Sequence, residues 1–325
     1  MKIVVDMLGG DLGIAATYDG LLKFIDKHKD VEIIAVGTES VLSPIKNKVK
    51  IINANKAINM DAHAMELLHD KDSSMSLAFN ACVNENADAI VSCGGTGALL
   101  TLASIRIKKL ENVIRPALIS PIPTLKDNKK TLLLDLGANS ENSVDELIGF
   151  IKMAEIYCHN VYNNSQPTFA LLSNGVEEGK GTPLIQETYK KIKDYNLPGF
   201  IGNIESSDIL KGNVDIIVAD GFTGNIALKA MEGTGNTVKS LLKDMFTSSL
   251  KNKLGYLLIK NDLKKKLNML SSKPLGGAMF IGCKKVVIKA HGNSDSIAFA
   301  NALETAYKCV NSNLVNKIDQ GLKNG

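Results

Sequence analysis

Short apolar runs alternate along the chain with longer stretches in which apolar and polar residues are mixed. Eight runs are rich in Val, Ile, Leu and Ala, and most of them lack polar alternation: residues 3–5, 33–36, 89–91, 117–119, 132–134, 169–172, 216–218 and 286–288. Continuous apolar strands separated by helical segments are typical of a mainly parallel sheet that is covered on both faces. The pattern therefore predicts an α/β fold, and more narrowly a three-layer α/β/α sandwich.

The stretches between the apolar runs predict helices, at residues 17–28, 74–84, 98–109, 143–162, 183–194 and 294–315. Ser143 stands three residues before Glu146, which is the spacing of a capping box. Pro183 falls in a first helical turn, where its missing N–H is harmless. These signals mark where helices start and say nothing about a substrate.

One region breaks this alternation. Residues 222–272 contain no convincing strand and have the pattern of amphipathic helix interrupted near Gly255. We expect a single domain spanning residues 1–325, with a helical hairpin at about residues 226–272 projecting from it. The predicted turn of the hairpin carries an apolar cluster between lysines, made up of Leu254, Tyr256, Leu257, Leu258 and Ile259. Such a turn suits an anionic lipid surface, and a contact between two subunits explains it equally well.

Charge is unevenly distributed along the 325 residues. The formal net charge is +4, but residues 251–266 hold six lysines against one aspartate, so the rest of the chain is near −1. A general nucleic-acid binder would spread Lys and Arg along a face and interleave aromatic residues. That class is therefore disfavoured. No apolar run is long enough to cross a bilayer, and residues 1–6 have the pattern of a strand rather than a signal peptide, so we expect a cytoplasmic protein.

The cysteines are five in number and far apart, without the spacing of metal ligands or of a disulfide framework: Cys82, Cys93, Cys158, Cys283 and Cys309. We expect them to be reduced and mostly buried. Cys158 precedes His159, but neighbouring residues on a helix point about 100° apart and cannot act as nucleophile and base.

Two apolar runs are each followed by a loop that suits an anion. After residues 169–172 the chain reads Glu177-Glu178-Gly179-Lys180-Gly181-Thr182, and after residues 216–219 it reads Asp220-Gly221-Phe222-Thr223-Gly224-Asn225. Both loops are predicted to lead into helices, whose free N–H groups favour phosphate. A lysine held among glycines adds a point charge. The pair of loops indicates chemistry on a phosphate.

Three further motifs follow predicted strands, and each is weaker. Gly9-Gly10-Asp11 allows close approach of a ligand but is not a dinucleotide-binding GxGxxG. Residues 92–97, with Thr96 and Gly97, suit either an anion nest or a tight turn, and they lack the lysine of a Walker loop. Asn139 closes the run 135–139 and suits a polar contact or a helix cap.

Taken in order, these motifs resemble those of PlsX, the bacterial phosphate acyltransferase family of phospholipid synthesis. The resemblance runs nearly end to end and is carried by Val5-Asp6 with Gly9-Gly10-Asp11, Thr96-Gly97-Ala98, Leu134-Asp135 with Gly137-Ala138-Asn139, residues 177–181, 200–205 and 220–225, and His291-Gly292. It implies transfer of a fatty acyl group from acyl carrier protein to inorganic phosphate, with no cofactor and no metal. It also implies an isocitrate/isopropylmalate dehydrogenase-like sandwich, a homodimer, and peripheral association with the membrane.

The resemblance implies site residues by position. Lys180 and Asn225 stand at the two positions that we expect to be catalytic. The remaining pocket would comprise Gly9, Gly10, Asp11, Thr96, Gly97, Asn139, Glu178, Gly179, Gly181, Asn203, Glu205, Asp220, Thr223, Gly224 and His291, of which His291 suits a structural role best. The chain departs from the family pattern at Leu12-Gly13-Ile14, Gly95, residues 140–143 and Met279-Phe280.

Other functions remain open at this point. A small-acyl phosphotransacetylase that uses coenzyme A shares the chemistry. A non-catalytic membrane scaffold would keep the sandwich and act through residues 251–266. A dehydrogenase ranks last, because fold alone does not determine function and no cluster of metal-binding aspartates is evident.

Overall fold

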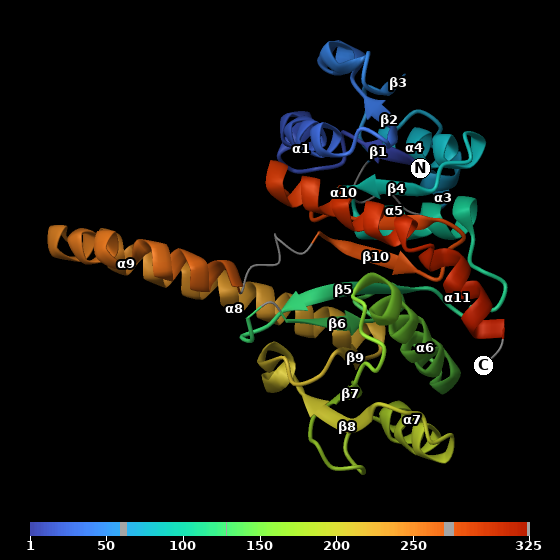
Figure 1. Cartoon of the computed structure of the whole chain (residues 1–325), viewed down its shortest axis with the longest axis vertical. Helices are drawn as coiled ribbons and strands as arrows, with labels where there is room; N and C mark the ends of the chain where they lie inside the picture. The colour runs from blue at the N-terminus through green and yellow to red at the C-terminus, as the bar shows by residue number, and fades with distance from the viewer. Residues whose placement is uncertain (59–63, 128, 270–275, 324–325) are drawn as a thin grey trace.

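The computed structural model describes residues 1–58, 64–127, 129–269 and 276–323. Its described strands form one sheet of 11 strands in the order β3-β2-β1-β4-β11-β10-β5-β6-β9-β7-β8 (Figure 1). The strands are β1 Lys2–Asp6, β2 Glu32–Gly37, β3 Lys50–Asn53, β4 Ala89–Ser92, β5 Ala117–Pro123, β6 Lys130–Leu134, β7 Phe169–Ser173, β8 Phe200–Glu205, β9 Ile216–Val218, β10 Ala278–Ile281 and β11 Val286–Lys289.

The sheet consists of two parallel halves joined by an antiparallel seam. Strands β3, β2, β1, β4 and β11 run parallel to one another, and β6, β9, β7 and β8 form a second parallel set. Between them, β10 is antiparallel to both β11 and β5, and β5 is antiparallel to β6. The seam has a consequence for function, because loops that follow strands of different halves need not meet.

All eight predicted strands are confirmed, and three further strands escaped prediction. Two of these, β3 and β8, are the edges of the sheet and are only partly buried. Edge strands need fewer apolar residues, so their sequences carry a weaker signal. The third, β10, is buried but has only four residues, and Ala, Met and Phe replace the β-branched residues that mark a strand.

Helices cover both faces of the sheet, which confirms the three-layer α/β/α sandwich. They are α1 Gly13–Lys27, α2 Glu39–Leu42, α3 Ala64–His69, α4 Ser74–Asn84, α5 Thr96–Leu102, α6 Val144–Val161, α7 Pro183–Asp194, α8 Gly221–Thr247, α9 Leu250–Met269, α10 Ser296–Asn311 and α11 Leu314–Lys323, with short turns η1 Ser43–Ile45, η2 Ala103–Ile107 and η3 Ser206–Lys211. One apolar core contains side chains of α1, α6, α7, α10 and α11, and the other contains those of α3, α4, α5 and the base of α8.

The predicted helices are all present, but three differ from the structure in extent. The helix expected at residues 17–28 starts at Gly13. The helix expected at residues 98–109 starts at Thr96 and becomes a π-helix over Ala103–Ile107. The helix expected at residues 294–315 is two helices, because Asn313 adopts a left-handed conformation with φ of 56° between α10 and α11. The capping box is present, since the Glu146 N–H donates to Ser143 Oγ at 3.3 Å and the Ser143 N–H donates to Glu146 Oε2 at 3.0 Å.

Helices α8 and α9 form an arm that projects to one side of the sheet (Figure 1). The interruption expected near Gly255 is wrong, because Gly255 lies inside α9 and the turn falls at residues 248–249. There Asn252 Nδ2 donates to Met245 O at 2.9 Å, and the Phe246 and Tyr256 rings pack with centroids 5.3 Å apart. These contacts override a single helical glycine, which costs only about 0.5–1 kcal/mol.

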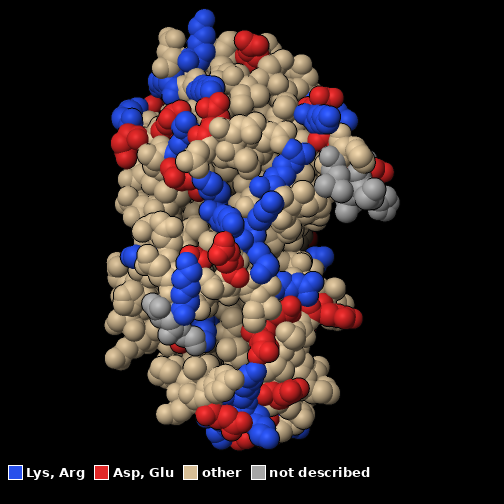
Figure 2. All heavy atoms as spheres, turned by 90° about the vertical axis from the view of Figure 1, so that its right-hand side faces the viewer, with Lys and Arg blue, Asp and Glu red and all other residues tan. Residues whose placement is uncertain are grey.

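The apolar cluster that the sequence assigned to the turn therefore lies within α9. Its members are exposed, from 39% for Tyr256 to 86% for Leu258; they are Leu254, Tyr256, Leu257, Leu258 and Ile259. No helix in the described part of the chain combines the length and apolar character that crossing a bilayer requires. Figure 2 shows the side of the molecule away from the arm, where Lys and Arg gather near the middle and Asp and Glu lie among them.

The five cysteines are buried and unpaired, as expected. Burial, together with nearby Asp215 and Glu155, raises the pKa of Cys158 to about 12. A thiol with such a pKa is not a nucleophile at neutral pH. The structure thus agrees with the inference that Cys158 and His159 do not act as a nucleophile and its base.

Candidate active site at the base of α8

The loop after β6 is held by one buried carboxylate. Asp135 is fully buried and accepts N–H groups from Leu118, Ala138 and Asn139 at 2.9, 2.9 and 3.0 Å. Burial raises the pKa of Asp135, and these hydrogen bonds oppose the rise. Asn139 Nδ2 donates to Asp135 Oδ2 at 2.7 Å and to Pro116 O at 3.0 Å. The Asn139 amide nitrogen thus fastens the loop to the sheet.

The first turn of α8 packs directly on this loop because two glycines allow it. A Cβ on Gly221 would lie 2.0 Å from Asn139 O, and a Cβ on Gly224 would lie 2.0 Å from Asp135 O. No larger residue fits at such distances without moving the backbone. The base of α8 is consequently locked to the carboxyl end of β6.

Residues 220–225 are this helical turn and not the loop that the sequence suggested. Asp220 is the N-cap, and its carboxylate accepts the N–H of Thr223 at 2.9 Å and the Thr223 hydroxyl at 2.7 Å. The Gly221 N–H donates to Asn142 Oδ1 at 3.1 Å. Side chains of the protein therefore already occupy two of the first-turn N–H groups that were expected to bind an anion, those of Gly221 and Thr223.

Asn225 is different, because its side-chain amide forms no hydrogen bond with the residues that the structure describes. It lies against Gly137, where a Cβ would come within 3.0 Å of Asn225 Cγ and Nδ2. Gly137 also has a φ of 103°, which only glycine adopts readily. The base of α8 thus presents a partly exposed amide whose donors and acceptor are free for a ligand.

The loop that carries Lys180 leaves the neighbouring strand. Strand β7 pairs in parallel with β9, with Leu171 opposite Val218, so the chain turns off at the same edge of the sheet after both strands. The Gly181 N–H donates to Asn174 Oδ1 at 2.9 Å, and Gln186 Nε2 donates to Gly179 O at 2.9 Å. These bonds order the loop. The exposed Lys180 ammonium has no ion pair or hydrogen bond within the described ranges.

Two other predicted residues of this half, Glu178 and Asn203, have structural partners. Glu178 pairs with Lys193 at 3.0 Å on the exposed surface. Asn203 supports the Lys180 loop, since its Nδ2 donates to Glu177 O at 2.8 Å, while its buried Oδ1 has no partner among the described residues. Glu205 is exposed at the end of β8.

A second group of predicted residues lies at the carboxyl ends of β1, β4 and β11, which run parallel. Gly9 packs so closely on the loop after β4 that a Cβ would be 2.6 Å from Gly94 N. The Asp11 N–H donates to Gly292 O at 2.8 Å. Thr96 and Gly97 start α5, which no side chain caps. His291 lies 3.8 Å from Glu232 of α8, and burial lowers the pKa of His291 while Glu232 raises it.

Helix α8 joins the two groups. Asn225 touches the loop after β6, and Glu232, seven residues further along nearly the same face, reaches His291. Seven residues of α-helix span about 10 Å. The structure thus places the predicted residues in two groups along α8 and does not bring them together around one ligand position.

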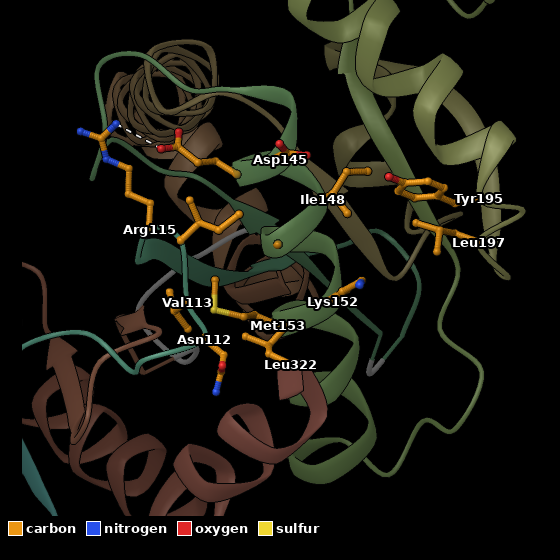
Figure 3. Close-up of a pocket in the computed structure, with 13 residues that line it drawn as sticks. Asn112, Val113, Arg115, Asp145, Ile148, Lys152, Met153, Tyr195, Leu197 and Leu322 are labelled. Atoms are coloured by element: carbon orange, nitrogen blue, oxygen red, sulfur yellow. Dashed lines mark hydrogen bonds and ion pairs between the residues drawn. The ribbon is translucent and has the colours of Figure 1, made fainter. Parts of the chain in front are cut away.

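The two cavities described for the chain lie elsewhere. One, of about 540 Å³, is lined by residues of α6, the loop before β5, the end of α7 and Leu322 (Figure 3). Its charged groups are already paired, Arg115 with Glu146 at 3.4 Å and Asp145 with Lys191. The other, of about 1020 Å³, lies beside His159 and Pro167. Neither includes a predicted site residue, and among the described residues no three His, Cys, Asp or Glu side chains group as metal ligands.

Comparison with known proteins identifies the family. A family model described as "Fatty acid synthesis protein" matches residues 1–317. Proteins named phosphate acyltransferase are 37% identical in Fusobacterium nucleatum and 38% identical in Clostridioides difficile, over 98% of this chain and 98% and 96% of theirs. The chain belongs to this family. The resemblance inferred from the motifs is therefore confirmed.

Solved structures of other proteins share the fold of this family member. A phosphotransacetylase from Streptococcus pyogenes has a TM-score of 0.59 at 14% identity, covering 97% of this chain and 94% of its own. An isocitrate dehydrogenase from Methylococcus capsulatus has a TM-score of 0.51 at 10% identity, covering 98% and 87%. At these identities the likeness concerns architecture, and it confirms the isocitrate dehydrogenase-like sandwich.

Two residues of the second group escaped the motif analysis, Lys289 and Glu232. Lys289 is the last residue of β11, two residues before His291. A lysine that closes an otherwise apolar strand was the available signal. Glu232 lies in the middle of a long helix, and no local pattern distinguishes it from other charged helical residues.

Proposed function

We propose that this protein transfers a fatty acyl group from acyl-acyl carrier protein to inorganic phosphate and forms acyl phosphate for phospholipid synthesis. Membership of the phosphate acyltransferase family is the observation that carries the proposal. The geometry supports it at two residues. Lys180 and Asn225 keep free polar groups on neighbouring segments, whereas most other polar residues nearby are occupied. In this proposal the whole chain works as one domain from which α8 and α9 project.

The chemistry needs a bound anion and a stabilised oxyanion. A phosphate oxygen attacks the thioester carbonyl, the C–S bond breaks, and the carrier leaves as a thiolate that takes up a proton. The Lys180 ammonium offsets the charge of the phosphate and holds it near the thioester. The Asn225 amide donates to the carbonyl oxygen as negative charge develops there. Because a thiolate is a good leaving group, little general-acid help is required.

Release of carrier thiol that depends on phosphate tests the proposal. With purified protein and acyl-acyl carrier protein, we expect Asn225→Ala to lower the rate by roughly 10²–10³-fold, the effect of losing one oxyanion donor. Lys180→Ala should lower the rate by roughly 10²-fold or more, because the phosphate is no longer held near the thioester. Lys193→Ala is the matched control, since it removes an exposed lysine beside the same loop that is paired with Glu178. The proposal fails if the wild-type protein releases no thiol, or if both substitutions leave the rate unchanged.

Two alternatives give different results in the same assay. A phosphotransacetylase would prefer an acyl-coenzyme A donor, so direct competition between the two thioesters separates them. A non-catalytic scaffold would bind liposomes and show no turnover with either donor. The fold shared with phosphotransacetylases does not favour the coenzyme A donor, because it concerns architecture alone.

The arm supplies the proposed membrane contact and dimer interface. Leu250, Leu254 and Leu258 are 80%, 65% and 86% exposed, and lysines flank them. An apolar surface of this kind marks an interaction site. In our proposal α8 pairs with a second subunit while the tip touches anionic lipid. Leu254→Glu with Leu258→Glu should abolish binding to anionic liposomes. Light scattering on the same variant shows whether the dimer depends on these residues too.

A further inference from the structure

The cavity of about 540 Å³ beside α6 has the size of a ligand site (Figure 3). Pockets for small molecules are concave, mostly apolar, and about 300–1,000 Å³ in volume. Helix α6 forms one wall of this cavity, the loop before β5 forms a second, and the segment after α7 forms a third. Neither Lys180 nor Asn225 is among the described residues that line it. The cavity is therefore separate from the candidate active site.

A glycine within α6 leaves the cavity open. Gly149 lies in the interior of α6 and lines the cavity, and an added Cβ would meet nothing within 4 Å. Glycine weakens a helix relative to alanine. Neither close packing nor a left-handed backbone requires glycine at this position, because the space beside it is open and its φ is not positive. What the missing side chain provides is room above the helix.

Apolar side chains line the inner part of the cavity. Val113, Ile148 and Met153 are all buried there. Two further lining residues, Ile114 and Tyr195, remain 56% and 58% exposed although they are large and apolar. Such a surface suits an aliphatic chain, and it leaves the hydrogen-bonding groups of a sugar or a nucleotide base without partners.

The other side of the cavity carries a cation with unused donors. In the view of Figure 3, Arg115 lies above the apolar side chains. Its Nη1 is 3.4 Å from Glu146 Oε1 and 3.4 Å from Glu141 O, whereas no described residue accepts a hydrogen bond from its Nη2 or Nε. A guanidinium has five N–H donors and matches two oxygens of a carboxylate or phosphate. Because exposed ion pairs contribute little to stability, Arg115 can turn to a ligand at low cost.

The carboxylates of the lining do not oppose an anion at Arg115. Glu146 Oε2 accepts the Ser143 N–H at 3.0 Å in the capping box, so Glu146 keeps a partner when Arg115 moves. Asp145 pairs with Lys191. An anionic group beside Arg115 would thus meet no carboxylate that lacks a partner of its own.

We propose that this cavity binds a single aliphatic chain that ends in an anionic group, with the chain over Gly149 and the anion at Arg115. Fatty acids and alkyl phosphates share this chemistry. The inference goes beyond the proposed function, because the site uses neither Lys180 nor Asn225 and takes no part in acyl transfer.

Binding of dodecanoate, measured by calorimetry below its micelle concentration and without acyl donor or phosphate, tests the site. Gly149→Leu fills the space over α6 with a strong helix former, so this variant should not bind at concentrations that saturate the wild-type protein. Arg115→Met should weaken binding about 10- to 100-fold, as for loss of a hydrogen bond to a charged group. Arg115→Lys keeps the charge and should recover part of the affinity.

The chain and the head group are tested separately. Shortening the chain should weaken binding about fourfold for each methylene that leaves the cavity. Dodecyl phosphate in place of dodecanoate identifies the head group, since the probe with the lower Kd carries the group that the site prefers. An affinity that does not depend on chain length overturns the inference, and so does a wild-type protein that binds neither probe.

The exposed leucines of α9 are a competing apolar surface, so Leu254→Glu with Leu258→Glu is the matched control. This variant and Lys180→Ala should bind dodecanoate as the wild-type protein does. Loss of binding in either of them would place the probe on the arm or in the active site and overturn the inference. Wild-type affinity in Gly149→Leu would overturn it as well. If Gly149→Leu does not fold, Arg115→Met decides, and unchanged affinity in that variant refutes the site.

Discussion

Gly137→Ala is the substitution that most directly tests how the structure positions Asn225. Gly137 has a φ of 103°, and an added Cβ would lie 3.0 Å from Asn225 Cγ and Nδ2 and 3.1 Å from Asn225 Cβ. An alanine side chain thus has two effects. It strains the backbone of the loop after β6, and it pushes the Asn225 side chain away from its place at the base of α8.

The two effects differ in size and in readout. Forcing a non-glycine residue into this conformation costs about 1–3 kcal/mol, so we expect the free energy of unfolding to fall by that amount. To relieve the close contacts with the added Cβ, the side-chain amide of Asn225 must move by a few tenths of an ångström. Since a misplacement of 1 Å can cost about 10²-fold in rate, we expect kcat to fall roughly tenfold, less than for Asn225→Ala.

Urea unfolding and phosphate-dependent thiol release measure the two effects on the same protein. Gly149→Ala is the matched control, because Gly149 lies within α6 and an added Cβ meets nothing within 4 Å. Alanine there should stabilise the protein by about 0.5–1 kcal/mol and leave kcat unchanged. If folded Gly137→Ala retains kcat within twofold of wild type, the assigned role of the Gly137 contact in positioning Asn225 is wrong.

Three further predictions concern stability. Gly224→Ala should lower the free energy of unfolding, measured in urea, by about 3 kcal/mol or more, because a Cβ would lie 2.0 Å from Asp135 O. A loss below about 1 kcal/mol would contradict the close packing of α8 on the loop after β6. Burial raises the pKa of Glu155 from 4.5 to about 7, so the folded state favours its protonated form and stability falls as pH rises from about 4.5 to 7. Glu155→Gln should therefore stabilise the protein by about 1–2 kcal/mol at pH 8, allowing for partial solvent screening, and have little effect at pH 4. Ser143→Ala should cost about 1 kcal/mol by removing the N-cap of α6, with kcat unchanged as the check that α6 is remote from the chemistry.

The site could be predicted from the sequence only in part. The order of the motifs identifies the family, and the loop carrying Lys180 follows a strand as expected. The roles of Lys180 and Asn225 remain predictions that the assays above decide. The glycines of residues 220–225 suggest a loop, whereas Asp220 and Asn142 cap a helix that begins at Gly221. A cap formed by a residue 79 positions away in the chain has no local signature.

The sequence by itself determined eight of the 11 strands and the positions of the longer helices, because apolar periodicity and capping residues act over a few positions and need no distant partner. It also determined the family, through motifs that keep their order. Tertiary structure alone decided the direction of each strand and the antiparallel seam that divides the sheet. It decided that Gly137 meets Asn225 and that Glu232 of α8 lies 3.8 Å from His291. Such contacts join residues that are far apart in the chain, and they form only when the whole sheet packs.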